Sequence, residues 1–473
     1  MRRALVADVL VAEIGSTTTV VNAFAGFAEE APRFLGQGVA PTTVLSGDVT
    51  VGLLQAIQDL CRTLGAEVKW QRMLATSSAA GGLRMTVHGL AYDMTARAAR
   101  EAALGAGAIV KLVTSGELTE QNLREIIDTA PNIILLAGGV DHGERATAVA
   151  NAEKIAALPL SVPVIYAGNI ACRQEVAKII AASGKRLLAV DNVYPRIDEL
   201  CIEPTRAAIQ AVFEEHIVHA PGMERVREMV QGSILPTPGA VMKAAEALYA
   251  TLGDLLVVDV GGATTDVHSV TEGSEELARL LINPEPVAKR TVEGDLGVYV
   301  NVGHVAALVK PHEAEKEGVD LACALQGWPP IPTTPEQLRA LNLLTRKAVE
   351  TALERHVGRV KHLYGPFGRS TIAQGKDLTE VRWVIGTGGP LTKLAEAAGM
   401  LRSAMRVSAK QEMYPRNFDV LIDRDYNLGV LGVLSQEYKR EALLLMQRSL
   451  GVAEGRRSVA EGRRSATPPP AKA

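Results

Sequence analysis

Short runs of Val, Ile and Leu alternate along this chain with longer segments in which Ala, Arg and Glu recur at helical spacing. Residues 95–108 (TARAAREAALGAGA) and 206–220 (RAAIQAVFEEHIVHA) follow the helical pattern, whereas the apolar run at 255–258 has the length and composition of a buried strand. Alternation of the two patterns is typical of layered proteins in which helices cover sheets. The pattern therefore predicts an α/β fold.

One arrangement of apolar and polar positions occurs twice. In each case an apolar strand leads through a turn rich in Gly, Ser and Thr into a second apolar strand, and one acidic residue, Glu13 or Asp259, precedes the turn. Further along each half, an apolar strand runs into two consecutive glycines. The four segments are VLVAEIGSTTTVVNAF (9–24), NIILLAGGVDHG (132–143), LLVVDVGGATTDVHSV (255–270) and RWVIGTGGPLTK (382–393). The same order in both halves predicts a duplicated α/β domain.

A segment near the middle of the chain, SILPTPGAV (233–241), contains two prolines and a glycine before a new helical pattern, so we expect the boundary between the halves there. The predicted lobes are residues 1–235 and 236–450, and a last helical pattern over 427–450 ends the second lobe. The tail, 451–473, repeats VAEGRRS and ends in ATPPPAKA. Such a composition cannot bury a core and predicts disorder.

Composition and charge narrow the possible partners. The 473 residues are 47% hydrophobic and 22% charged, which suits two or three domains with their own cores. The formal net charge is −3 and no block of Lys and Arg occurs, so a nucleic-acid partner is not expected. Asp8 and Glu13 interrupt the first apolar run, and no apolar stretch approaches the ~20 residues that cross a bilayer. We therefore expect a cytoplasmic protein without a membrane partner.

The cysteines point to the same compartment. Four of them lie far apart without a CxxC pair: Cys61, Cys172, Cys201 and Cys323. This spacing disfavours a disulfide framework and a zinc site and fits a reducing environment. We expect all four to be buried thiols.

The two turns have the composition of anion sites. Gly, Ser and Thr leave backbone N–H groups accessible and add hydroxyl groups, a combination that attracts phosphate oxygens. A carboxylate beside such a turn would repel phosphate unless a divalent cation lies between them, and Mg²⁺ commonly takes one or two carboxylates together with waters and phosphates. Glu13 and Asp259 are therefore candidate Mg²⁺ ligands. The alternative interpretation of each segment is a tight β-turn with solvated Thr and Asp side chains.

Other motifs are weaker. DVHSVT (266–271) lacks the glycine of the cobalt-ligating DxHxxG pattern, so His268 is not a favoured corrin ligand. His216 and His219 lie three apart at a predicted helix end, where a polar terminus is commoner than a metal site. GTGGPL has Leu391 at the third glycine position of a dinucleotide fingerprint, and neither a P-loop nor a GxSxG sequence occurs.

Three motifs together resemble a known superfamily. EIGSTTT (13–19), DVGGATTD (259–266) and VIGTGGPLT (384–392) look like the phosphate-one, phosphate-two and adenosine motifs of actin, sugar kinases and DnaK-type chaperones. The resemblance implies an α/β, actin-like ATPase fold with two duplicated ribonuclease-H-like domains and a nucleotide cleft between them. It also implies ATP or ADP with Mg²⁺ as the bound cofactors.

Within that superfamily, the chain resembles the accessory proteins encoded beside adenosylcobalamin-dependent glutamate mutase, also called MutL or GlmL. The resemblance covers nearly the whole chain to about residue 448 and includes ATSSAAGGLRMTVHGL (75–90), VDNVYPRIDELCIEPTRAAI (190–209) and RTVEGDLGV (290–298). The mismatch-repair protein that shares the name MutL has a different fold, and this sequence does not resemble it.

The resemblance assigns roles to individual residues. Glu13 and Asp259 would hold the metal, and Asp259, Asp266 and Glu13 would act on the attacking water. Two departures from the superfamily pattern stand out: Glu13 replaces the usual Asp, and Ala263 stands where glycine is common. The expected nucleotide contacts are Gly15, Ser16, Thr17, Thr18, Gly261, Gly262, Ala263, Thr264, Thr265, Glu293, Gly386, Gly388, Gly389 and Pro390.

The expected function follows from the family. Such a chain would be an ATP-binding chaperone or reactivating factor, with weak ATP hydrolysis, that acts on the subunits of an adenosylcobalamin-dependent mutase. Two alternatives stay open from the residues alone. The first is a small-molecule kinase of the sugar or acetate kinase type, and the second is a scaffold that responds to nucleotide without turnover.

Overall fold

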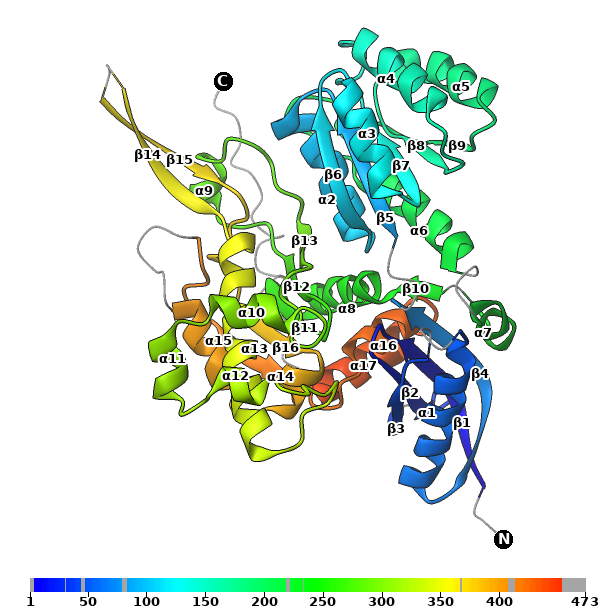
Figure 1. The fold of residues 1–473 in the computed structure, drawn as a ribbon, viewed down its shortest axis with the longest axis vertical. Coiled ribbons are helices and arrows are strands. Elements are labelled where there is room, and N and C mark those ends of the chain that lie inside the picture. Colours follow the sequence, from blue (N-terminus) through cyan, green and yellow to red (C-terminus); the bar gives the residue numbers. More distant parts are fainter. Residues whose placement is uncertain are drawn as a thin grey trace, which may run out of the picture. The chain divides into compact units, whose positions relative to one another are not determined.

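The computed structural model describes residues 4–29, 31–43, 47–78, 83–217, 222–232, 234–365, 368–406 and 413–452. The chain forms two compact units (Figure 1). The first comprises Met1–Met242 and Leu281–Gly294, and the second comprises Lys243–Leu280 and Asp295–Ala473. Among the described residues, none of the helices combines the length and apolarity that a membrane span requires.

The first unit contains a sheet with the strand order β3-β2-β1-β4-β10. Strands β1, β2 and β3 are antiparallel neighbours, whereas β4 is parallel to both β1 and β10. The strands are β1 (Ala4–Ile14), β2 (Thr18–Ala25), β3 (Arg33–Pro41), β4 (Glu67–Ser77) and β10 (Ile234–Pro236). The apolar run of β1 is buried on both faces, as expected for a central strand.

Helix α1 (Val49–Leu64) packs on β2 and β3. It begins where the Asp48 carboxylate accepts a hydrogen bond from the Thr50 N–H at 2.8 Å, and it ends at Gly65, whose φ of 60° suits glycine. Its buried positions recur at three- and four-residue spacing: Leu53, Ala56, Ile57 and Leu60. Helix α7 (Met223–Met229) packs beside α1 in the same unit.

A second, fully parallel sheet is inserted between β4 and β10, with the doubly wound order β6-β5-β7-β8-β9. Its strands are β5 (Arg84–Gly89), β6 (Ile109–Ser115), β7 (Ile133–Leu136), β8 (Val164–Tyr166) and β9 (Leu187–Ala189). The accompanying helices are α2 (Arg97–Gly105), α3 (Glu120–Thr129), α4 (Ala146–Ala157), α5 (Arg173–Ala182) and α6 (Glu203–Ile217). We did not predict this inserted sheet from the sequence.

The inserted sheet overturns one sequence-based equivalence. Strand β7 carries the segment 132–143 and belongs to the inserted sheet, so this segment is not the counterpart of 382–393. By strand order the counterpart is β4, which pairs in parallel with β1. The prediction was wrong because both β4 and β7 are apolar parallel strands, and an apolar run does not encode which sheet it joins.

His88 is a fully buried titratable residue in strand β5 of the inserted sheet. It is 0% exposed, and its ring nitrogens lie 2.8 Å from Thr114 Oγ1 and 3.0 Å from Thr86 Oγ1. Burial disfavours the charged ring and lowers the pKa of His88 to about 3. The imidazole is therefore held neutral within the sheet.

The sheet of the second unit has the strand order β13-β12-β11-β16-β17, with β13 (Ala288–Glu293) at its edge beside β12. The pair β11–β12 is antiparallel, and β11, β16 and β17 are parallel, which repeats the arrangement of β2, β1, β4 and β10. The strands are β11 (Leu255–Val260), β12 (Thr265–Val270), β16 (Trp383–Thr387) and β17 (Asp419–Ile422). The prediction of an α/β, actin-like ATPase fold with two duplicated ribonuclease-H-like domains is confirmed in this strand order.

Helices and a hairpin complete the second unit. Helix α13 (Pro335–His356) begins with a capping box between Thr334 and Gln337 and packs on β11 and β12. Figure 1 shows the β14 (Arg359–Gly365) and β15 (Gly368–Gln374) hairpin extending from this unit as a separate ribbon. The other helices are α9 (Glu275–Ala278), α10 (Val302–Leu308), α11 (Pro311–Lys316), α12 (Leu321–Ala324), α14 (Gly389–Lys393) and α15 (Ala397–Arg406).

The expected boundary between the lobes and the expected last helix can both be compared with the structure. The segment 233–241 holds strand β10 and the start of helix α8 (Thr237–Leu252), and the predicted lobe boundary at residue 235 stays a prediction. The prediction of a single helix over 427–450 is wrong, because the segment forms two helices, α16 (Leu428–Leu434) and α17 (Lys439–Ser449). The Ser435 hydroxyl donates to the Gly432 carbonyl at 2.7 Å where α16 ends.

The cysteines also differ from expectation. Of the four, Cys172 is buried, Cys61 and Cys201 are half-buried and Cys323 is exposed. The prediction of four buried thiols is therefore wrong, because a Cys on the exposed side of a short helix has the same local sequence as a buried one. The predicted disordered tail lies almost entirely outside the described residues.

Candidate functional site

The first candidate turn joins β1 to β2. The register pairs Glu13 with Val20 and Ile14 with Thr19, and the Gly15 N–H donates to the Thr18 carbonyl at 3.0 Å. A Cβ on Gly15 would lie 2.7 Å from that carbonyl oxygen, so the tight closure requires glycine. The turn thus presents two residues, Ser16 and Thr17, at its tip.

The tip of the first turn is polar and open. Ser16 is exposed, and its Oγ lies 3.4 Å from the Ser78 Oγ, just beyond the end of β4. The Thr17 carbonyl accepts a hydrogen bond from the Thr42 N–H at 3.0 Å, which fixes the turn from one side. Among the residues that the structure describes, no hydrogen bond engages the N–H groups of Ser16 and Thr17. Those donors are left for a ligand or water.

The second candidate turn joins β11 to β12 and has the same form. The register pairs Asp259 with Asp266, and the Gly261 N–H donates to the Thr264 carbonyl at 2.9 Å. Glu13 and Asp259 therefore occupy equivalent positions, as do Thr17 and Ala263. Ala263 does not adopt a positive φ, so its Cβ causes no backbone strain and the departure from glycine is tolerated.

Two carboxylates lie beside the second turn. Asp259 and Asp266 are directly opposite on antiparallel strands, so both side chains leave the same face of the sheet. Asp266 is 4% exposed and accepts a hydrogen bond from the Thr264 hydroxyl at 2.9 Å. Since that hydroxyl hydrogen is committed to Asp266, Thr264 Oγ1 can offer only lone pairs to a cation or donor.

A short segment, residues 295–301, holds the second turn in place, and we call it the brace. It donates hydrogen bonds to three consecutive carbonyls of the turn, while no bond among the described residues engages the N–H groups of Gly262 and Ala263. The turn's carbonyls therefore face the protein, whereas its amides are left for an anion. The bonds are Val298 N to Gly261 O (3.2 Å), Tyr299 N and Val300 N to Gly262 O (2.9 and 2.8 Å), and Asn301 Nδ2 to Ala263 O (2.9 Å).

The brace is itself anchored. Arg355 of α13 donates two hydrogen bonds to Asp295, at 2.7 and 3.0 Å. These bonds lower the pKa of Asp295 against the opposing effect of burial. The Trp328 indole N–H donates to the Val298 carbonyl at 2.9 Å. The Thr265 hydroxyl is buried and donates to the Leu296 carbonyl at 2.8 Å, so it ties the hairpin to the brace.

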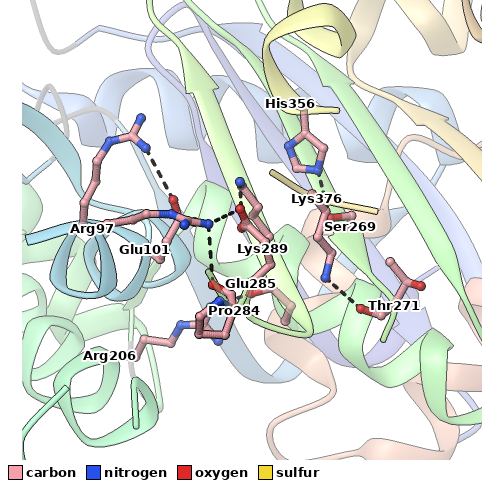
Figure 2. Close-up of polar contacts among 12 residues, drawn as sticks. Arg97, Glu101, Arg206, Ser269, Thr271, Pro284, Glu285, Lys289, His356 and Lys376 are labelled. Atoms are coloured by element: carbon pink, nitrogen blue, oxygen red, sulfur yellow. Dashed lines mark hydrogen bonds and ion pairs between the residues drawn. The ribbon is translucent and has the colours of Figure 1, made fainter. Parts of the chain in front are cut away.

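Strand β12 is also fixed on its other side. Figure 2 shows His356 and Lys376 beside this strand, with His356 Nε2 2.8 Å from the Ser269 Oγ. Lys376, which is 3% exposed, donates to the Thr271 carbonyl at 2.7 Å. The end of β12 remote from the turn is thus held by two buried side chains.

The predicted adenosine motif follows β16 and reaches the same place. Gly388 has a φ of 87°, and a Cβ on it would lie 2.6 Å from the Asp259 carboxylate. Gly389 and Pro390 begin α14, and a Cβ on Gly389 would meet no atom within 4 Å. A Cβ on Gly386 would instead meet the Leu401 side chain at 2.8 Å, so this glycine serves packing against α15.

Sequence reasoning missed Asp423, which organises the neighbouring loop. Asp423 is 0% exposed and accepts hydrogen bonds from the Thr387 hydroxyl at 2.8 Å and from the Ser449 hydroxyl at 2.6 Å. It also accepts the Asn427 and Leu428 N–H groups at 3.0 and 2.9 Å. The sequence signal that could have identified Asp423 is its position directly after the apolar run of β17. Its role is to hold the loop after β16 against the start of α16.

The predicted site residues fall into two groups. Glu13, Gly15, Ser16, Thr17 and Thr18 share the first hairpin, in the first unit. The Asp259–Asp266 hairpin and the Gly388–Gly389 loop come together in the second unit, and Glu293 ends strand β13, the edge strand beside β12 of that hairpin. Among the described residues, no group of three or more His, Cys, Asp and Glu side chains is placed to hold a metal. Glu13 and the Asp259–Asp266 pair are the carboxylates that lie beside the two turns.

Residues 9–450 match the MutL protein family. The curated Protein MutL of Clostridium tetanomorphum is 35% identical over 426 residues, which cover 86% of this chain and 92% of that protein.

Similar solved structures superpose weakly. A nucleotide-free acetone carboxylase has a TM-score of 0.37 at 11% identity, over 92% of this chain and 70% of its own. A nucleotide-free diol dehydratase-reactivating factor has a TM-score of 0.36 at 14% identity, over 91% of this chain and 100% of its own. A glycerol dehydratase reactivase has a TM-score of 0.33 at 13% identity, over 91% and 100%. The family match covers most of the chain, and the chain belongs to the MutL protein family.

Proposed function

We propose that this chain binds ATP with Mg²⁺ through its two hairpin turns and acts as a reactivating chaperone for an adenosylcobalamin-dependent mutase. One observation carries the nucleotide part. Two turns of the same register and closure occur in two sheets of the same strand order, each with a carboxylate at the end of its first strand. A pair of such turns suits the phosphates of one metal-bound triphosphate.

The chemistry of each group follows from its surroundings. The amides of Ser16, Thr17, Gly262 and Ala263 would contact phosphate oxygens, because the carbonyls beside them are already engaged by the protein. Glu13 and Asp259 would hold hydrated Mg²⁺, and Gly388, Gly389 and Pro390 would border the adenosine.

Hydrolysis would be weak. Asp266 is the buried carboxylate nearest the second turn and already holds the Thr264 hydroxyl, so it is positioned to orient a water beside the phosphates. Glu13 is one methylene longer than aspartate, which changes the distance between its carboxylate and the cation. We therefore expect slow ATP hydrolysis, whose rate would set how long the ATP-bound conformation lasts.

The partner is inferred from the family. Resemblance to accessory proteins of glutamate mutase and membership of the MutL protein family support a mutase, of glutamate or a related aminomutase, as the protein acted upon. ATP and ADP would favour different closures of the two lobes, and each nucleotide can shift the closure only by its different affinity for the two states. The mutase would respond to that closure by releasing damaged cobalamin.

Calorimetry with the full chain tests nucleotide binding. We expect heat on adding ATP with Mg²⁺, and a Kd at least about tenfold weaker in Asp259→Asn, since about 1.4 kcal/mol corresponds to each tenfold change. Glu272→Gln, an exposed acid just after β12, is the control and should bind as the wild type does. Absence of heat with the wild-type chain would refute the proposal.

Co-purification from the native source, with and without ATP, tests the partner. A mutase retained in one nucleotide state and released in the other supports the proposal. A metabolite that stimulates turnover and is itself phosphorylated would make the chain a small-molecule kinase. ATP-dependent light scattering without any retained partner would make it a nucleotide-responsive scaffold.

A further inference from the structure

The loops at one edge of the inserted sheet carry an excess of acidic residues. All neighbouring strands of this sheet are parallel, so the loops that follow them emerge at the same edge. These loops contain seven Asp and Glu residues against two Arg residues. We call this surface the acidic edge, and its loops are residues 90–96, 116–119, 137–145, 167–172 and 190–202.

Part of the negative charge on the acidic edge is exposed and has no cationic partner. Asp93, Glu144 and Asp198 are exposed, and none of them forms an ion pair with another residue that the structure describes. A surface of one sign favours a partner of the opposite sign, both in the encounter and in the complex. The acidic edge therefore suits a basic partner.

Three large side chains with apolar surface are exposed on the same edge. Tyr92, Ile170 and Ile197 are 60%, 46% and 70% exposed, and they lie in the loops after β5, β8 and β9. The loops are tied together, because one Asp141 carboxylate oxygen accepts the Ile170 N–H and the Asn192 side-chain amide, both at 2.9 Å. Exposed apolar side chains rimmed by polar groups are typical of a surface that binds protein.

A complementary surface is present on the same chain, in the second unit. The β14–β15 hairpin, which we call the arm, projects as a two-stranded ribbon (Figure 1). Its residues 359–374 include Arg359, Lys361 and Arg369 but no Asp or Glu. Strand alternation places Arg359, Lys361 and Leu363 on one face, and Leu363 is 52% exposed. The arm thus presents positive charge together with an apolar side chain.

The arm has unpaired strand edges. Among the described strands, β14 and β15 form a ladder only with each other. Near the root of the arm, the Ala373 N–H donates to the Leu280 carbonyl at 2.7 Å. A two-stranded hairpin has little stability of its own, and its free edges and exposed face can be covered by a partner.

We propose that the arm of one copy of this chain docks on the acidic edge of a second copy. The inference goes beyond the proposed function and does not depend on nucleotide. A strand of seven residues extends roughly 20 Å, so a face two strands wide buries on the order of a few hundred Å² and makes a weak contact. Because the arm and the acidic edge are different surfaces, copies add head to tail until a ring closes.

Sedimentation velocity of the full chain, without nucleotide, tests this assembly. Between ~5 and ~200 µM protein in ~0.05 M salt, we expect the weight-average sedimentation coefficient to rise, since a small charged interface gives a micromolar affinity. Salt at ~1 M shortens the Debye length to about 3 Å and should remove most of that rise. A wild-type chain that stays monomeric over this range in low salt would overturn the proposal.

Two double variants test the two surfaces separately. Lys361→Glu with Leu363→Ser alters the arm, and Ile197→Lys with Glu199→Lys alters the acidic edge. Each variant should be monomeric alone, whereas an equal mixture should form dimers and nothing larger, because the mixture offers one intact arm and one intact edge. Arg416→Glu changes an exposed arginine of the second unit outside the arm, and it should assemble as the wild type does.

Circular dichroism checks that the variants are folded, and Arg369→Glu replaces the arm variant if that one does not fold. Association that persists in both double variants would overturn the proposal, as would an equal mixture that stays monomeric. Loss of assembly in Arg416→Glu would also overturn it, because the effect would then come from net charge and not from the arm.

Discussion

The buried imidazole of His88 makes the inserted sheet sensitive to acid. Its pKa is about 3 in the folded chain, against about 6.5 when solvated. Below pH 6.5 the unfolded state binds a proton that the folded state does not bind until about pH 3, so stability is fully present above pH 6.5 and is lost as the pH falls. The free energy of unfolding falls with a slope that approaches about 1.4 kcal/mol per pH unit, and the loss between pH 6.5 and pH 5 amounts to about 1.6 kcal/mol.

Hydrogen exchange of peptides from β5, β6 and β7, corrected for the pH dependence of chemical exchange, measures this loss locally. We expect the open population to rise about 16-fold between pH 6.5 and pH 5. His88→Asn should remove this slope whatever it does to stability at pH 7. His142→Asn changes an exposed histidine of the same unit and should keep the slope. An unchanged slope in His88→Asn would refute the reasoning.

Three further outcomes are expected. Gly388→Ala should weaken binding of ATP with Mg²⁺ about tenfold in calorimetry, because the left-handed φ costs about 1–2 kcal/mol and the Cβ displaces a carboxylate, whereas Gly399→Ala in α15, whose Cβ would meet no atom within 4 Å, should bind normally. Asp423→Asn should lower the thermal midpoint, since a buried acceptor of four hydrogen bonds loses its charge, and an unchanged midpoint would contradict this. Cys323 should react with a thiol reagent in the native chain and Cys172 only after unfolding; equal rates would contradict the burial.

The two hairpins could be predicted because their information is local. A strand, a turn of small residues and a second strand are neighbours in sequence, so the closure by Gly15 and by Gly261 follows from composition and spacing. The resemblance to a known superfamily supplied the fold, and the strand orders confirm it.

The contacts that hold the second turn in place could not be predicted from the sequence in the same way. The brace reaches the second turn from residues 295–301, more than thirty positions away, and nothing in EGDLGVYVN marks the Asn301 amide as a donor to the Ala263 carbonyl. Gly386 and Gly388 look alike in the sequence, yet one packs on α15 and the other lies against Asp259. The two glycines differ in the atoms that surround them, and these surroundings exist only in the folded chain.

The amino-acid sequence by itself determined the α/β class, the two glycine-rich turns and the acidic residue before each of them, because these depend on residues a few positions apart. Only the tertiary structure decided that β7 joins an inserted parallel sheet and that β13 forms the edge of the sheet beside β12. Strand partners and buried ion pairs join residues far apart in the chain, and their free energy depends on the packing and exclusion of water that folding creates.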